Sequence, residues 1–139
     1  MKVRNFEPAD TEEVVALWQA CELVRPWNDP LLDIQRKLQV NDSLFLVGLS
    51  EGGVVASVMG GYDGHRGWMN YLAVAPGYQH KGYATALVTC LEDKLLNVGC
   101  PKINLQIRTD NVAVQAFYKK LGFSVDDAIS MGKRLIPDD

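Results

Sequence analysis

The residues with the clearest chemical potential lie in one loop, residues 74–85, which reads Val-Ala-Pro-Gly-Tyr-Gln-His-Lys-Gly-Tyr-Ala-Thr. An apolar run precedes this loop and an amphipathic segment follows it, so we expect the loop to open a helix. The first turn of a helix has backbone N–H groups without partners and a partial positive charge. Gly82 lets the backbone approach a ligand closely, and Lys81 and His80 add side-chain donors. The loop therefore predicts a phosphate or pyrophosphate site, with an ordinary strand-to-helix turn as the alternative.

Hydrophobic periodicity places this loop between a strand and a helix. A turn at 63–67 leads into an apolar segment, 68–74, that is typical of a strand. Beyond the loop, apolar residues recur with helical spacing and predict a helix that ends near Gly99-Cys100-Pro101. The apolar stripe of that helix comprises Ala84, Leu87, Val88, Leu91 and Leu95.

The N-terminal half predicts three strands and two helices. We expect strands over 3–6, 44–49 and 54–59, the last two joined as a hairpin by a turn at 50–53. Asp10 and Glu13 have the spacing of a capping box and predict the start of a helix. A break at 25–30 separates it from a second helix. The apolar faces are Val14, Leu17, Trp18 and Cys21 in the first helix and Leu31, Ile34 and Leu38 in the second.

The C-terminal part predicts a strand, a short helix and a final strand. Ile103, Leu105 and Ile107 alternate with polar residues, as in a strand with one buried face. Asn111 or Asp110 is expected to cap a helix that carries Ala113, Ala116, Phe117 and Leu121 and ends at Gly122. Segment 129–135 is expected to close the sheet. The order β-α-α-β-β-β-α-β-α-β predicts an α/β protein whose mixed sheet is covered by helices.

Composition and charge favour a single soluble domain over residues 1–139. Hydrophobic residues make up 47% and charged residues 22% of the chain, whose net charge is −3. This balance predicts no nucleic-acid or membrane partner, whereas a basic loop in an acidic protein favours a small anionic ligand. The three cysteines have no CxxC spacing, and the N-terminus does not resemble a signal peptide, so we expect a reducing, cytoplasmic location. Cysteines and histidines assemble no metal site.

Two motifs together resemble the GNAT N-acetyltransferase superfamily. The segment Gln-His-Lys-Gly-Tyr-Ala, 79–84, fits the family's [RQ]xxGx[GA] acetyl-CoA loop, and Asn111 with Ala-Phe-Tyr-Lys-Lys-Leu-Gly-Phe, 116–123, fits its second motif. The element order also matches, so the resemblance spans nearly the whole chain. It implies a mixed, mostly antiparallel sheet flanked by helices and splayed between strands 4 and 5. It also implies acetyl-CoA as acyl donor and an amine acceptor, and the sequence is most similar to small bacterial members that acetylate protein N-terminal amines.

The resemblance assigns a role to each matching position. Strand residues 72–74 match the backbone that pairs with the pantetheine arm and polarises the thioester carbonyl. Asn111 matches a residue that hydrogen-bonds the pantetheine, and Tyr118 matches the acid that protonates the departing coenzyme A thiolate. The implied cofactor-binding residues are Leu72, Ala73, Val74, Gln79, His80, Lys81, Gly82, Tyr83, Ala84, Thr85, Asn111 and Tyr118. Without the resemblance, residues 72–74 also fit a plain core strand, Asn111 fits a helix cap, and Tyr118 fits a half-buried structural tyrosine.

One position departs from the family pattern. Gln106 stands where related N-terminal acetyltransferases often have a glutamate as general base, and an amide cannot act as a base near neutral pH. The base is therefore unassigned, with His65, Asp63 and Glu22 as candidates. Arg25-Pro26-Trp27 is expected to border the acceptor cleft or to pack on the core. The aromatic residues Tyr62, Trp68 and Tyr71 are expected to line the acceptor site or to lie in the core.

Three functions compete at this stage. The first is an acetyl-CoA-dependent N-acetyltransferase in which a protein N-terminus, a lysine or a small amine attacks the thioester directly. The second is a catalytically weak acetyl-CoA-binding regulatory module, which Gln106 favours. The third, a nucleotide-binding protein, is disfavoured because the loop lacks the GxxxxGK[ST] pattern. The expected assembly is a monomer or homodimer, and no metal is expected.

Overall fold

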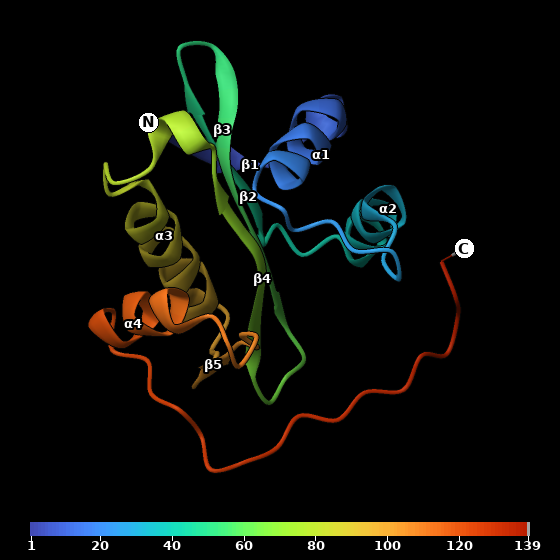
Figure 1. Cartoon of the computed structure of the whole chain (residues 1–139), viewed down its shortest axis with the longest axis vertical. Coiled ribbons are helices and arrows are strands. Elements are labelled where there is room, and N and C mark those ends of the chain that lie inside the picture. The colour runs from blue at the N-terminus through green and yellow to red at the C-terminus, as the bar shows by residue number, and fades with distance from the viewer. Residues whose placement is uncertain (139) are drawn as a thin grey trace.

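The computed structural model describes residues 1–138 and arranges them around one sheet with strand order β1-β2-β3-β4-β5 (Figure 1). The first four strands pair antiparallel, and β4 pairs parallel with β5. This confirms the predicted mixed, mostly antiparallel sheet. The strands are β1 Lys2–Asn5, β2 Phe45–Ser50, β3 Gly53–Tyr62, β4 Gly67–Val74 and β5 Ile103–Asn104. The helices are α1 Thr11–Ala20, α2 Pro30–Val40, α3 Tyr83–Asn97 and α4 Val112–Lys120, with 3-10 turns η1 Pro8–Asp10 and η2 Pro76–Tyr78.

Helices cover both faces of the sheet, with α1 and α2 on one side and α3 and α4 on the other (Figure 1). The alternation of side chains along β2 explains how one sheet supports two cores. Leu46 faces the cluster that contains Leu87 and Leu91 of α3, whereas Val47 faces the cluster that contains Trp18 of α1. All five side chains are buried.

The sheet opens between β4 and β5. Within the described residues these strands pair only at Gly67 with Ile103 and at Trp68 with Asn104. The rest of β4, as far as Val74, runs on without a partner strand on that side, as the predicted splay requires. The strand expected over 103–107 is accordingly shorter than predicted.

Two other predictions from the sequence are wrong. Asp10 and Glu13 form no capping box: Asp10 accepts a bidentate contact from Arg4, at 2.8 and 2.9 Å, and the backbone N–H of Glu7 at 2.8 Å. Glu13 instead accepts the N–H of Val54 at 2.8 Å, at the β2–β3 hairpin. The partly buried Arg4–Asp10 pair thus ties β1 to the start of α1. A guanidinium offers the carboxylate two charged donors, which outcompete a single backbone cap.

The final strand is also absent from the described residues. Segment 124–138, the C-terminal tail, leaves α4 and runs as an irregular extended chain to the N-terminal end of α2 (Figure 1). Side chains hold it: Asp126 contacts Lys102 and Asn104 at 2.9 Å, and Ser130 contacts Gln106. Ile129 and Leu135 are exposed rather than packed on the sheet. Polar side-chain anchors therefore replace the predicted backbone ladder.

Asp10→Asn is expected to lower the free energy of unfolding by about 1–3 kcal/mol, because it removes a charged acceptor from a largely buried pair. The hydrogen bonds from Arg4 hold the pKa of Asp10 below its usual value, so its contribution is present above pH 4 and is lost as pH falls through the folded pKa. Urea unfolding at pH 7 and at pH 3 measures both effects. Glu12→Gln, at an exposed acid in the same helical turn, is the control and should change little; equal losses in the two variants contradict the assignment.

Candidate functional site

Strand β4 contains a bulge at the point where the sheet opens. Its register with β3 pairs Asn70 with Met59 and Ala73 with Ser57, so Tyr71 and Leu72 together face one residue of β3. Tyr71 has φ of 53°, in the left-handed region that bulky residues rarely adopt. The bulge therefore reorients the last three residues of the strand relative to the rest of β4.

The bulge directs backbone groups into the open side of the sheet. The N–H of Ala75 donates to Val55 of β3 at 2.8 Å, so by alternation the peptide groups of Val74 and Leu72 point away from β3. The carbonyl of Val74 accepts the amide of Gln79 at 3.0 Å and the thiol of Cys21 at 3.3 Å. Burial raises the pKa of Cys21, which stays a neutral thiol donor. These three strand residues thus present a polar backbone edge.

The basic loop follows this edge directly and opens α3, as predicted. His80 and Gly82 both have positive φ, 62° and 81°, and Gly82 is the residue at which α3 starts. The first turn of α3 contains no acidic residue, so its N–H groups and dipole keep their positive potential. The Lys81 ammonium lies 5.6 Å from the centroid of the Tyr78 ring. Gln79, Tyr83, Ala84 and Thr85 complete the turn between strand and helix.

Helix α4 brings the second motif to the same side of the molecule. Asn111 caps it, accepting the N–H of Val114 at 3.3 Å, which selects this residue over Asp110. Tyr118 is buried between Phe117 and Phe123, with ring centroids 5.1 and 5.4 Å away. Burial raises the pKa of Tyr118 to about 12, so its phenol stays protonated at neutral pH.

An open groove of about 1070 Å³ lies among α3, β5, α4 and the C-terminal tail. Tyr118, Gln106, Leu105 and Ser130 are among its lining residues. Gln106, which follows β5, therefore lies at this groove, and its side-chain amide donates to Ser130 of the tail. Residues 72–74, residues 79–85 and Asn111 are not among its lining residues, so Tyr118 is the residue of the expected cofactor set that faces this groove.

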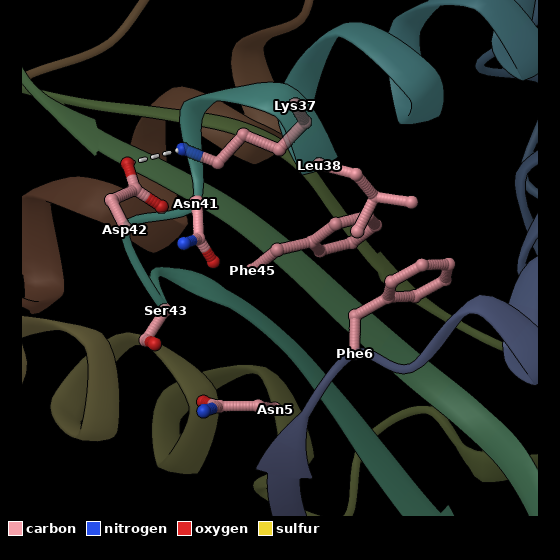
Figure 2. A pocket seen from close by; sticks show the side chains of 8 residues that line it. All are labelled: Asn5, Phe6, Lys37, Leu38, Asn41, Asp42, Ser43 and Phe45. Carbon is pink, nitrogen blue, oxygen red and sulfur yellow. Dashed lines mark hydrogen bonds and ion pairs between the residues drawn. The ribbon is translucent and has the colours of Figure 1, made fainter.

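The pocket drawn in Figure 2 lies between α2, β1 and β2 and is much smaller, about 110 Å³. Lys37 bonds to Asp42 across its wall at 2.7 Å. A space of this size holds no more than a few water molecules, so this pocket is not a site for a coenzyme. Its lining residues are Asn5, Phe6, Lys37, Leu38, Asn41, Asp42, Ser43 and Phe45.

The candidate bases lie in different places. Asp63 and His65 lie in the β3–β4 turn, at the closed end of the splay, roughly 20 Å along β4 from Val74. Backbone N–H groups of Arg66 and His65 lower the pKa of Asp63, which makes it a poorer base. Glu22 follows Cys21, whose thiol reaches Val74, and its exposed position is next to the open end.

The aromatic residues expected at the acceptor site or in the core are spread along the sheet, and Trp68 lines the groove that also contains Gln106 and Tyr118. Tyr62 and Trp68 bond within the β3–β4 turn region, Tyr62 to Gly64 and Trp68 to Asp63, at the closed end of the sheet. Tyr71 stacks on Trp18 in the core beneath α1. The α1–α2 connection does reach the open side: Trp27 is 55% exposed, and the guanidinium of Arg108, just beyond β5, lies 5.6 Å from its ring centroid.

Sequence reasoning missed several residues at this site. Arg108, Cys21 and Ser57 each contact the open side or the bulge, and no motif marks them. Asp138 was also missed, although it lies at the start of α2 rather than at the open side: it accepts the N–H of Asp29 at 2.8 Å and pairs with Arg36 at 2.9 Å, and these contacts lower its pKa to about 2. A polar residue at a core position of a strand, as Ser57 is, was the only available signal.

Among the described residues, no group of three or more His, Cys, Asp or Glu side chains is arranged to hold a metal ion. No helix in residues 1–138 combines the length and the apolar character needed to cross a membrane.

Residues 11–123 match the acetyltransferase (GNAT) family over most of the chain. The chain belongs to this family. It is an acyltransferase, and members of the GNAT family use acetyl-CoA as the donor. The chain is 52% identical over 138 residues to an acetyltransferase of Yersinia enterocolitica, covering 99% of this chain and 98% of that protein.

Solved structures support the same fold. Ard1 from Thermoplasma volcanium is 26% identical with a TM-score of 0.77, covering 90% of this chain and 83% of that one. An aminoglycoside antibiotic 6'-N-acetyltransferase from Acinetobacter haemolyticus is 17% identical with a TM-score of 0.74, covering 98% of this chain and 99% of that one. At that identity the second likeness concerns the fold alone.

Gly82→Asp is expected to abolish coenzyme A binding, because it adds a negative charge where backbone N–H groups would face pyrophosphate and strains a residue with φ of 81°. Calorimetric titration of the folded variant with coenzyme A measures the affinity. Gly99→Asp is the matched control, since Gly99 has φ of 85° and lies at the opposite end of α3. Unchanged affinity in Gly82→Asp contradicts the phosphate-loop assignment.

Proposed function

We propose that this GNAT enzyme transfers the acetyl group of acetyl-CoA directly to an amine, with the reaction centred in the opening between β4 and β5. One observation carries the proposal: the polar backbone edge at residues 72–74 is joined through the short η2 turn to the glycine loop at the N-terminus of α3. An extended pantetheine arm pairs with the first, and the pyrophosphate binds the second. Their spacing along the chain suits the two parts of one ligand.

Each residue set has one task in the proposed reaction. Residues 79–85 bind the pyrophosphate, residues 72–74 and Asn111 bind the pantetheine arm, and a backbone N–H of the strand polarises the thioester carbonyl. The neutral amine attacks the carbonyl carbon, the C–S bond breaks, and the sulfur takes the proton of the Tyr118 hydroxyl. The nitrogen releases its extra proton to water, and the Tyr118 phenolate regains a proton from solvent. Burial keeps that phenol protonated until the thiolate forms, which suits a general acid. No acyl-enzyme is formed.

The acceptor enters from the side bordered by the α1–α2 connection. Trp27, Arg108 and the end of the C-terminal tail near Asn28 lie along this border. The two solved relatives described above include an antibiotic acetyltransferase, so the shared fold does not select among acceptors. We propose an amine of a protein N-terminus, a lysine or a small molecule. A panel of such amines, assayed by release of free coenzyme A thiol, tests the proposal; binding of acetyl-CoA with no transfer to any of them contradicts it.

A second function is favoured by Gln106. An amide that contacts Ser130 occupies the position where a carboxylate base is frequent, as in an acetyl-CoA-binding regulatory module with little turnover. Single-turnover transfer from bound acetyl-CoA distinguishes the two. Transfer within seconds supports the enzyme, and bound acetyl-CoA that stays intact supports the module.

Tyr118→Phe is expected to lower turnover by about 10²- to 10⁴-fold, the usual contribution of general acid catalysis, and to leave acetyl-CoA affinity nearly unchanged. The phenyl ring keeps the contacts with Phe117 and Phe123, so the fold should hold. Steady-state kinetics with a responsive amine and calorimetry with acetyl-CoA provide the two measurements. A variant with wild-type turnover shows that Tyr118 is structural.

Gln106→Glu is expected to raise the rate near neutral pH and to move the pH–rate profile to lower pH, because a carboxylate can take the proton of the acceptor amine. The wild-type rate should climb with pH as more amine becomes neutral. Gln115→Glu, in the same groove, controls for added charge. If a folded Gln106→Glu enzyme has the wild-type pH profile, the proton leaves by another route, and Glu22 becomes the next residue to replace.

A further inference from the structure

Ser57 occupies an unusual position for a hydroxyl. Among residues 1–138, Asp10 and Ser57 are the buried polar side chains, and Ser57 is fully buried in the middle of β3. A β-branched apolar residue packs better at such a strand position, and burying a hydroxyl costs free energy unless it is hydrogen-bonded. Both hydrogen-bonding functions of Ser57 are used: it accepts the indole N–H of Trp18 at 2.9 Å and donates to the carbonyl of Tyr71 at 2.8 Å.

These bonds act on the strained residue of β4. Tyr71 has φ of 53°, and its ring stacks on Trp18 with centroids 3.7 Å apart. Its hydroxyl donates to Asp33 of α2 at 2.6 Å. The side chain is thus fixed by two helices, and the hydroxyl of Ser57 holds the main-chain carbonyl of the same residue.

The direction of that carbonyl determines the direction of the next N–H. A trans peptide is planar, and its C=O and N–H point in opposite directions. Because the carbonyl of Tyr71 points to Ser57, the N–H of Leu72 points away from β3, toward the open side of the sheet. The indole of Trp18 occupies one acceptor position of the Ser57 hydroxyl, and the hydroxyl donates its proton to the Tyr71 carbonyl.

We propose that Ser57 is a positioning residue for acetyl transfer: by holding the Tyr71 carbonyl, it aims the N–H of Leu72 at the thioester carbonyl of acetyl-CoA. The inference rests on the proposed function, in which the backbone of residues 72–74 polarises that carbonyl. Ser57 touches no substrate itself. It acts through one peptide group, whose dipole stabilises the negative charge that develops on the oxygen during attack.

Carbonyl vibration tests the inference without an acceptor. Acetyl-CoA labelled with carbon-13 at the thioester carbonyl is bound to the enzyme, and its stretching band is isolated by infrared difference spectroscopy. A hydrogen bond from Leu72 lowers the frequency relative to a carbonyl without a donor. We expect a lowered band in the wild type, a band displaced to higher frequency in Ser57→Ala, and recovery in Ser57→Thr, which retains the hydroxyl.

Val47→Ala is the matched control. Val47 is the β2 partner of Ser57 in the sheet register and is buried in the cluster that contains Trp18, but its apolar side chain cannot hydrogen-bond to the Tyr71 carbonyl. It is expected to lose stability and keep the wild-type band. Removing an oxyanion donor lowers turnover by about 10²- to 10³-fold. A donor that points in the wrong direction is weakened rather than removed, so Ser57→Ala should lower turnover at least about 10-fold, with little change in KM for acetyl-CoA.

The outcomes separate the inference from the function on which it rests. A lowered band in the wild type that is unchanged in Ser57→Ala overturns the role of Ser57 and leaves the backbone donor in place. A wild-type band that does not move on binding overturns the donor itself, and the inference with it. Should Ser57→Ala fail to fold, Ser57→Cys keeps a weak donor of similar size, and a partial displacement of its band supports the inference, whereas a wild-type band overturns it.

Discussion

The left-handed backbone of Tyr71 is the constraint on which the geometry of the site depends. A residue with a side chain is disfavoured there by roughly 1–2 kcal/mol, and an unrestrained strand would relax to the extended conformation. The stacking of Tyr71 on Trp18 and its bond to Asp33 oppose this relaxation. Such a stack and such a hydrogen bond each contribute about 0.5–1.5 kcal/mol, so together they match the strain. Helices α1 and α2 therefore shape β4 as well as cover it.

The face of the sheet that α3 and α4 cover positions the glycine loop and Tyr118. A Cβ at Gly60 of β3 would lie 2.5 Å from a methyl group of Leu91, so the glycine lets α3 approach the sheet closely. The same cluster includes Tyr118 of α4. Strand β4 lies between the two clusters, and beyond Trp68 it has no partner strand on the side of β5. A fully paired β5 would occupy the edge that the proposed ligand needs.

Local patterns predicted the elements of this fold well, and long-range contacts account for what they missed. The apolar stripe of α3, the loop before it and the cap at Asn111 depend on neighbours within a few residues, and the structure confirms these elements. The carboxylate of Asp10 binds Arg4 of β1 instead of its own helix, which no local pattern reports. Local patterns also fail to predict the bulge. Nothing in the sequence around Tyr71 marks a left-handed residue, because the contacts that hold its conformation come from Trp18, Asp33 and Ser57.

A connected series of contacts links the C-terminal tail to the bulge. The free energy that each contact contributes decides whether the tail helps to hold the bulge. Asp138 pairs with Arg36, and Arg36 lies 3.6 Å from Asp33, which accepts the Tyr71 hydroxyl. The side chain of Arg36 is 44% exposed, and exposed ion pairs contribute about 0–1 kcal/mol. The contacts of Tyr71 with Trp18 and Ser57 are made to two fully buried side chains, so solvent screens them less. The bulge is therefore held mainly from inside the sheet, and loss of the exposed Arg36 pairs should leave it in place.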